Sequence, residues 1–397
     1  MERIGRQSDT LKAVFGEPQT EPPPYASARS SVASSGRSSV SSAAHLSTPP
    51  RLGYAQNHHL PSLAVPRGSL VLVTGANSFQ GMHIVAQLLE NGYLVRGTVR
   101  DSSKAAWTTK FFTDRYGGAR YSAIVVPDMA VQGAFDTAIR DCAGVIHVAS
   151  VTDLSPDPNL VVTPTIAGAL NALEAAAREP RVVRFVYTSS VAASISHARG
   201  ERYEISSHTW NMTDFNVAWA APPYERERAL SVRGSAKMQT EAAIWRWHEV
   251  NKPTFVLNTV LPDVLWGEVL DPKNQTHPLS IEILQAIYNN AIPPAYPPSH
   301  FVDVQDSATL HLAALLLPDV QSQRIFAVAA AWNMHSLIRT MRTLFPYRKL
   351  ERDVPEGGVD RTVFREAGKA EALLRKMGAK GWMGMERSVE RTCVAFR

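Results

Sequence analysis

The sequence has little cysteine, no long apolar run and no dense block of like charge. Its 397 residues include two cysteines, Cys142 and Cys393, which lie far apart and outside any CxxC pairing. Neither a zinc site nor a disulfide framework is therefore indicated, and a reducing compartment is expected. No run of about eighteen apolar residues occurs, which argues against a transmembrane helix and a membrane partner. The 41 basic and 36 acidic residues form no basic block of the kind that binds nucleic acid.

Residues 1–66 differ in composition from the rest of the chain. They are rich in Ser, Pro, Ala and Arg and show no apolar periodicity, so they cannot bury enough surface to offset the entropy of ordering. We predict a disordered tail. It has no hydrophobic segment of the kind found in a secretory signal, and its acidic residues disfavour an organelle transit peptide. A cytoplasmic location is expected, with the mitochondrion as the alternative.

One short motif in this tail suggests a partner. Pro22, Pro23, Pro24 and Tyr25 form a PPxY sequence, which would dock on a WW domain as a polyproline II segment. A chance match is the stronger alternative, because the whole tail is rich in proline.

The stretch that organises the rest of the chain is an apolar run followed by a glycine turn. Leu70 to Val73 predicts a strand buried on both faces, and the helical spacing of apolar residues after Gly81 predicts that a helix follows at once. The first backbone N–H groups of such a helix can bind a pyrophosphate. Gly75 would allow the tight turn, and Gly81 would let helix and strand pack closely. A purely structural turn without a ligand is the alternative.

Strand and helix patterns then alternate along the chain. The predicted strands are Leu94 to Val99, Tyr121 to Val126, Gly144 to Val148, Val183 to Thr188 and Thr254 to Leu261; the predicted helices are near Ala105 to Tyr116, Val131 to Asp141, Thr163 to Arg178 and Ala229 to Glu249. This alternation predicts right-handed βαβ crossovers and a doubly wound parallel sheet of the Rossmann type.

Beyond Pro262 the alternation degrades, although Ser307 to Leu317 predicts a buried helix, and Arg365 to Met377 predicts an amphipathic helix with Ala372, Leu373 and Met377 on one face. We predict a nucleotide-binding domain at 67–262 with a lid insertion at 197–228. Residues 263–397 form a smaller substrate lobe in this prediction, and within it 301–330 return to the nucleotide-binding domain. The lobe and the insertion would cover the carboxyl edge of the sheet, where such folds bind ligands.

The string TGANSFQG at 74–81 resembles the TGAxGFxG turn of the extended short-chain dehydrogenases/reductases. The middle glycine of that pattern, where the backbone comes nearest the pyrophosphate, is Ser78 here, and its hydroxyl could bond a phosphate oxygen. The resemblance implies that the turn contacts the cofactor through Gly75, Asn77, Ser78, Phe79, Gln80 and Gly81.

The strand ends carry further parts of the resemblance. Arg100 ends the second strand and Lys104 lies close by, a pair that favours the 2′-phosphate of NADP, although Asp101 leaves NAD or a plain surface ion pair open. Asp128 and Met129 resemble the pair that contacts adenine in the family. The remaining cofactor contacts implied by the family strings VIHVAS and LNTVLP are Val148, Ala149, Ser150, Pro262 and Val264. His147, inside an apolar strand, is interpreted as a core histidine.

The catalytic residues implied by the resemblance are a serine and a tyrosine–lysine pair. The string VYTSS places the serine at Ser190, with Ser189 as the next candidate, and this hydroxyl would polarise the substrate carbonyl. Polar residues that simply close the strand are the alternative. The YxxxK pattern places the lysine at Lys237, and the resemblance implies that this lysine would hold the nicotinamide ribose. The tyrosine position of the pattern is occupied by Arg233. A guanidinium is a poor proton donor, and loss of a general acid typically costs about a hundred- to ten-thousandfold in rate.

Three consequences of Arg233 stay open from the sequence. The guanidinium could stabilise the developing alkoxide while water gives the proton, Tyr224 could replace the tyrosine, or the protein could bind cofactor without turnover. We expect an NADPH-dependent reductase of an aldehyde or ketone in secondary, polyketide-like metabolism, similar to the fungal reductases grouped with dihydroflavonol reductase. The alternatives are a catalytically impaired cofactor-binding regulator and, disfavoured by Arg100, an epimerase or dehydratase.

Overall fold

The computed structural model describes residues 60, 62–196, 203–275, 278–291, 293, 296–350 and 358–396. The predicted disordered tail, apart from its last few residues, and the PPxY motif with Pro22, Pro23 and Tyr25 lie outside the described residues. The description of the fold therefore begins just before the first strand.

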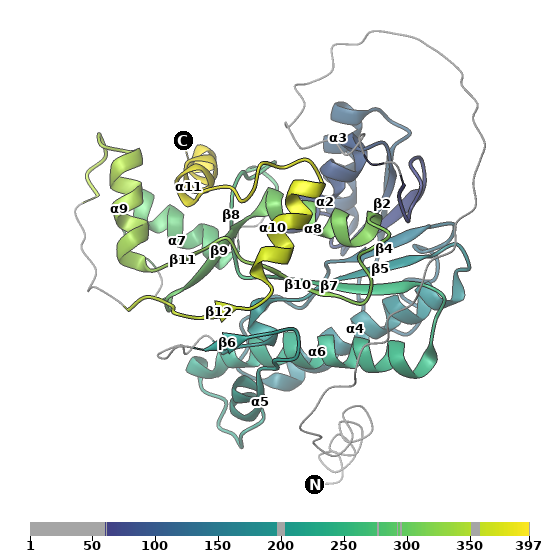
Figure 1. The fold of residues 1–397 in the computed structure, drawn as a ribbon, viewed down its shortest axis with the longest axis horizontal. Coiled ribbons are helices and arrows are strands. Elements are labelled where there is room, and N and C mark those ends of the chain that lie inside the picture. The colour runs from purple at the N-terminus through teal and green to yellow at the C-terminus, as the bar shows by residue number, and fades with distance from the viewer. Residues whose placement is uncertain are drawn as a thin grey trace.

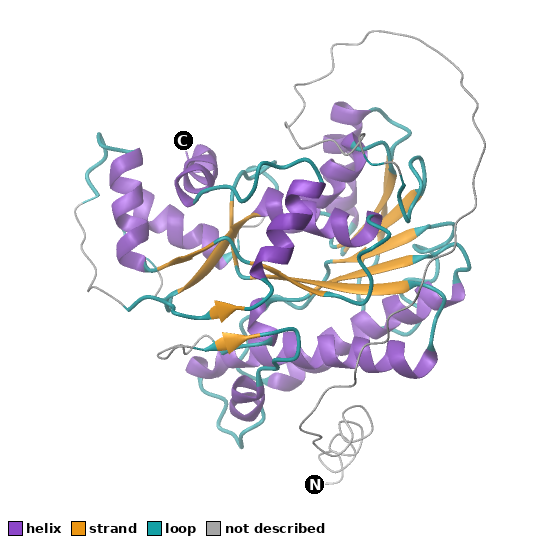
Figure 2. Cartoon of the chain, in the orientation of Figure 1, coloured by secondary structure: helices purple, strands orange, loops and turns teal. Residues whose placement is uncertain are grey.

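The fold is built on a sheet of seven parallel strands (Figures 1 and 2). Their order across the sheet is β3-β2-β1-β4-β5-β7-β10, which is that of a doubly wound Rossmann fold. The predicted fold class is thereby confirmed. The strands are β1 (Leu70–Thr74), β2 (Leu94–Val99), β3 (Tyr121–Val125), β4 (Gly144–His147), β5 (Arg184–Thr188), β7 (Val256–Pro262) and β10 (Arg324–Ala327).

Helices cover both faces of this sheet, since successive strand residues are buried on opposite sides. Val71 and Val73 face one apolar core while Leu72, between them, faces the other. The first face is covered by α2 (Phe79–Glu90), α8 (Val304–Leu316) and α10 (Ala367–Lys376), with α3 (Ser102–Tyr116) beside them, and the second by α4 (Pro158–Arg178) and α6 (Ala229–Asn251) (Figure 1). Apolar residues in consecutive strand positions are what this two-sided burial requires.

Helix α4 is long and apolar enough, by length and composition alone, to cross a membrane. It is the single helix among the described residues that meets this test. Half of its most apolar window is buried inside the fold, and it packs along α6. A core helix of a globular protein passes the same test, so this finding is weak evidence for a membrane span.

A second lobe is formed by the segments that follow the carboxyl ends of β7 and β10. Each of these strands leads within three residues into a smaller sheet, of order β11-β9-β8, which packs against a separate apolar core. This lobe contains β8 (Val264–Trp266), α7 (Leu279–Tyr288), β9 (Ser299–Asp303), β11 (Ala330–Trp332), α9 (Met334–Leu344), α11 (Met385–Cys393) and the short helix η3 (Val394–Phe396).

The segment between β5 and α6 forms a small unit of its own beside the main sheet (Figure 1). Its strand pairs in parallel with a strand from the C-terminal part of the chain, so two distant segments meet there. The elements are η1 (Val191–Ala193), β6 (Glu204–Ile205), α5 (Met212–Ala218), η2 (Arg226–Arg228) and the partner strand β12 (Val363–Phe364).

Two details of the sequence prediction are wrong. Residues 131–141 form successive turns rather than a helix, because Gly133 takes a positive φ of 76° and most backbone bonds there span three residues instead of four. In α10 the buried face holds Ala370, Leu374 and Met377. Ala372, which the sequence suggested for that face, is exposed.

Candidate active site

The turn between β1 and α2 has the geometry of an anion site. Gly75 takes a φ of +64°, which favours glycine, and a Cβ on Gly81 would lie 2.3 Å from the carbonyl oxygen of Gly75. Ser78 has an ordinary φ of −74° and caps α2, its Oγ accepting the Gly81 N–H at 3.0 Å. The backbone therefore needs no glycine at position 78, but the serine occupies one of the N–H groups at this helix end.

Two observations fit this turn to a dinucleotide. The Gln80 side chain is 5% exposed, and neither its amide nitrogen nor its amide oxygen has a hydrogen-bond partner among the described residues. Such orphaned buried groups are rare unless a ligand completes them. A Cβ on Gly75 would also lie 3.1 Å from the Ala149 nitrogen, so the turn and the end of β4 form a cradle with no room for larger residues.

At the end of β2, two basic side chains differ in their contacts. Asp101 caps α3 and binds Lys104, with 2.8 Å between Nζ and Oδ2. Hydrogen bonds from Lys104 and Ser103 hold the pKa of Asp101 well below its ordinary value. Arg100 is exposed and makes no hydrogen bond or ion pair within the described ranges. The carboxylate is thus engaged while the guanidinium remains available for a phosphate.

The third and fourth strands end in the other predicted contacts. Asp128 is exposed and accepts the Ala130 N–H, while Met129 packs against Gly168 of α4. Thr74 Oγ1 accepts the N–H groups of Val148 and Ala149, both at 3.0 Å. This hydroxyl fixes the end of β4, which runs on to Ser150, opposite the glycine turn.

His147 is a core residue, as the sequence predicted. Its Nδ1 lies 3.1 Å from Thr74 Oγ1, and its ring is buried among Phe135, Phe185 and Tyr187. Burial lowers its pKa to about 3. The imidazole is therefore neutral and is not a proton donor at physiological pH.

The two serines after β5 point in different directions. Ser189 Oγ donates to the buried Glu241 carboxylate at 2.7 Å. Ser190 Oγ donates to the carbonyl of Pro262 at 3.3 Å and accepts the Ala192 N–H. Ser189 thus belongs to the core, and Ser190 is the partly exposed hydroxyl at the carboxyl end of the sheet.

Lys237 reaches the same strand end from α6. Its Nζ donates to the carbonyl oxygen of Thr188 at 3.0 Å. Burial, and then the charge of Arg233 one helical turn earlier, lower the pKa of Lys237 to about 7. Arg233 itself is exposed, with no hydrogen bond or ion pair to the residues that the structure describes. The sheet end thus brings together Ser190, Lys237 and the segment from Pro262 to Val264.

A buried ion pair, which the sequence did not predict, lies in the same part of the fold as Ser190 and Lys237. Glu241 and Arg324 are fully buried, with Arg324 Nε 2.9 Å from Glu241 Oε1. Thr259 Oγ1 donates to the same carboxylate, and Arg324 also donates to the carbonyls of Ser207 and Thr209. The one sequence signal was an arginine at the start of the otherwise apolar strand β10. The pair ties α6, the end of β5, the middle of β7 and the start of β10 to the segment around β6.

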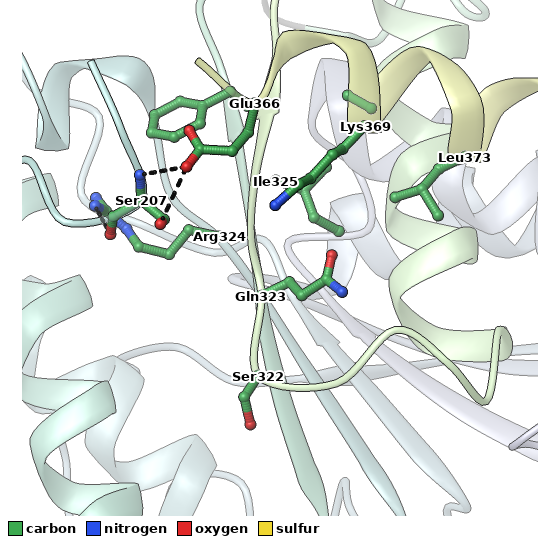
Figure 3. Close-up of a pocket in the computed structure, with 10 residues that line it drawn as sticks. Ser207, Ser322, Gln323, Arg324, Ile325, Glu366, Lys369 and Leu373 are labelled. Atoms are coloured by element: carbon green, nitrogen blue, oxygen red, sulfur yellow. Dashed lines mark hydrogen bonds between the residues drawn. The ribbon is translucent and has the colours of Figure 1, made fainter. Parts of the chain in front are cut away.

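A cavity of about 180 Å³ lies on the outer side of β10, next to this ion pair (Figure 3). Ser207 donates to Glu366 across it, and Lys369 and Leu373 of α10 line another wall. None of the predicted catalytic or cofactor-binding residues lines it. The cavity is therefore distinct from the glycine turn and from Ser190.

The strand order, the glycine turn at the start of α2 and the polar residues at the strand ends define a Rossmann-type dinucleotide-binding protein. Residues 71–209 match the model of the NAD dependent epimerase/dehydratase family. Aldehyde reductase 2 of Sporidiobolus salmonicolor is 39% identical over 83% of this chain and 97% of that protein. The chain belongs to this family, as its sequence motifs predicted.

Two further comparisons concern reductases. Ketoreductase adrE of Penicillium rubens is 35% identical over 85% of this chain and 97% of that protein. Among solved structures, Gre2 of Candida albicans in complex with NADPH is 26% identical, with a TM-score of 0.71 over 83% of this chain and all of that chain. The expected similarity to fungal aldehyde and ketone reductases is confirmed by these relatives.

Proposed function

We propose that this protein reduces an aldehyde or ketone with NADPH, in secondary, polyketide-like metabolism and in the cytoplasm. The observation that carries the proposal is that Ser190 Oγ donates to the carbonyl of Pro262 and Lys237 Nζ to the carbonyl of Thr188, both at the carboxyl edge of the sheet, the edge at which the turn from Gly75 to Gly81 also begins. The printed names of the relatives, an aldehyde reductase and a ketoreductase, agree with it. The unpaired Arg100 favours the phosphorylated cofactor.

The described residues divide the work between them. When bound, NADPH supplies a hydride to the carbonyl carbon. The first turn of α2 and Gln80 hold the pyrophosphate end, Asp128 and Met129 the adenine, and Arg100 the 2′-phosphate. Lys237 holds the nicotinamide ribose. Ser190 donates a hydrogen bond to the substrate oxygen, so the carbonyl is oriented and polarised before hydride arrives.

A cofactor-binding protein without turnover is the second candidate, and Arg233 favours it. The guanidinium stands one helical turn before Lys237, where the family resemblance places the proton-donating tyrosine, and a guanidinium is a poor proton donor. A protein of this kind would keep every cofactor contact and lose the reaction.

One experiment separates the two candidates. NADPH binding and oxidation are measured for the wild type, Arg233→Tyr and Ser190→Ala with a panel of aromatic and aliphatic aldehydes and ketones. For a reductase we expect turnover by the wild type, with a loss of about a hundredfold or more in Ser190→Ala at unchanged NADPH affinity. Turnover by Arg233→Tyr alone would contradict the proposal and favour the second candidate.

A further inference from the structure

A stripe of charged side chains on α6 faces the end of β5. Residues four apart on a helix share one face. On this face Glu241 accepts the hydroxyl of Ser189 at 2.7 Å, and Lys237 Nζ donates to the carbonyl oxygen of Thr188 at 3.0 Å. Arg233 is the next position of the stripe, about 6 Å beyond Lys237 along the helix axis.

The direction of α6 places Arg233 beyond the strand ends. Near the end of this helix, His248 Nε2 lies 3.0 Å from the carbonyl oxygen of Phe255, just before β7 begins. Lys237, earlier in the helix, is bonded to Thr188, the last residue of β5. The helix therefore runs from the carboxyl edge of the sheet to the amino edge. Its turn with Arg233 extends past the carboxyl edge, where ligands bind in such folds.

The predicted contacts of cofactor and substrate surround the same turns of α6. Val151, directly after Ser150, packs against an apolar cluster that contains Val232, the residue before Arg233. The short helix η1, which begins directly after Ser190, also packs against α6. The ends of β4 and β5 thus both lie beside the part of the helix that carries the arginine.

The charge of Arg233 is left without a counterion. Its side chain is exposed and has no hydrogen bond or ion pair to any residue in the described part of the chain. Burial, and then the charge of Arg233, lower the pKa of Lys237 to about 7. Glu241 acts on Lys237 in the opposite direction, but its carboxylate is already engaged by Arg324. An anion beside these two basic groups would be attracted by both.

We infer that Arg233 binds a carboxylate of the substrate, and that the substrate is a short oxo acid. This inference rests on the proposed function. The two parallel N–H groups of a guanidinium match the two oxygens of a carboxylate. Because Arg233 is one helical turn from Lys237, the expected ribose contact, the carbonyl and the carboxylate are only a few bonds apart.

The carboxylate binds without reacting. The carbonyl carbon receives the hydride from NADPH, the π pair of the C=O bond moves to oxygen, and that oxygen takes a proton from water. Arg233 thereby selects the substrate and is not required to donate a proton, for which a guanidinium is poorly suited.

The test compares acids with their neutral methyl esters: phenylglyoxylate, acetoacetate and levulinate. We expect the wild type to prefer the acid by about tenfold or more in kcat/KM. Arg233→Gln should lower this acid-to-ester ratio about ten- to hundredfold, mainly through KM. Arg233→Lys, which keeps the charge but loses the planar fork, should fall between them. Arg246→Gln is the matched control, an exposed arginine of the same helix paired with exposed Glu249, and should leave the ratio unchanged.

A second readout needs no turnover. Isothermal titration of the protein–NADP⁺ complex should show tighter binding of mandelate than of mandelamide, and Arg233→Gln should remove this difference. Equal reduction of acid and ester by the wild type would overturn the inference and leave the reductase proposal intact. Equal losses for acid and ester in Arg233→Gln would also overturn it, since the guanidinium would then act on the carbonyl oxygen. NADPH binding without turnover of any carbonyl compound would overturn both.

Discussion

Ser78 shows how one residue alters a cofactor turn without altering its backbone. Its φ of −74° is open to any residue, so the turn keeps its shape, yet Oγ engages the Gly81 N–H, one of the donors that an anion at this helix end could use. The serine thus stabilises the free helix at the expense of one donor to the ligand. The sequence pattern does not predict this competition between the cap bond and a bond to a ligand, because it shows only that serine replaces a glycine.

We predict that Ser78→Gly binds NADPH more tightly, by about tenfold, because one backbone N–H is released to a charged oxygen. Loss of the cap should cost only a few tenths of a kcal/mol when glycine replaces serine. Isothermal titration of the wild type, Ser78→Gly and Ser78→Ala measures the effect, and the alanine variant separates crowding by Cβ from engagement of Oγ. Weaker binding by both variants would mean that the hydroxyl is itself a phosphate ligand.

At the scale of elements, the buried pair of Glu241 and Arg324 joins the end of β5 to α6, β7 and β10. The carboxylate of α6 accepts from Ser189, next to Ser190, and from Thr259 of β7. The Arg324 guanidinium of β10 also donates hydrogen bonds to the carbonyls of Ser207 and Thr209, and it lies 4.1 Å from the Trp210 ring centroid. Every polar atom of the pair that faces the interior is matched, which is the condition under which a buried charge is tolerated.

We predict that Glu241→Gln and Arg324→Met each lower the free energy of unfolding by about 3–5 kcal/mol, because each leaves an uncompensated buried group. The double variant should lose less than the sum of the two. Thermal and urea unfolding measure these values. Arg365→Met is the control, since Arg365 and Glu204 form an exposed ion pair in the same region and should contribute little. Additive losses would contradict direct coupling within the pair.

The sequence predicts elements well where a local pattern decides them. The strand expected at Leu94 to Val99 is β2 with those bounds; it follows the turn at Gly92, which takes a φ of 86°, and ends before the polar residues from Arg100 on. Helix α8 begins at Val304, three residues before the predicted start, since Asp303 caps it by accepting the Gln305 N–H. The predicted helix at 131–141 failed because a glycine in the left-handed region outweighed the apolar spacing.

The candidate site likewise contains residues that a local sequence pattern predicts and residues that it does not. Ser190 and Lys237 could be placed from local strings, because each lies in a motif at the end of a strand or within one helix. The buried pair beside them could not, since Arg324 is 83 residues from Glu241. Pairs of this kind arise only when crossovers bring separate strands to one edge, and no periodicity within either segment encodes them.

At the scale of the whole molecule, the core of the main sheet begins a few residues before β1. Val65 is fully buried, its carbonyl accepts the Tyr93 hydroxyl at 2.9 Å, and the Ala64 N–H donates to Leu316 at the end of α8. Leu60 and Leu63 pack against the same core. Leu60 and residues 62–66 are thus part of the folded unit, although the composition of the sequence placed them in the tail.

We therefore predict different outcomes for two truncations. Removal of residues 1–59 should leave the melting temperature and NADPH affinity unchanged, because their composition predicts a disordered segment. Removal of 1–66 should lower stability by several kcal/mol: burial of Val65 is lost, at about 1.5–3 kcal/mol, and the buried Tyr93 hydroxyl is left unpaired, at about 1–3 kcal/mol. Differential scanning fluorimetry with and without NADPH measures both. Destabilisation by the shorter truncation would show that the first 59 residues pack on the fold, and it would contradict the disordered tail that their composition predicts.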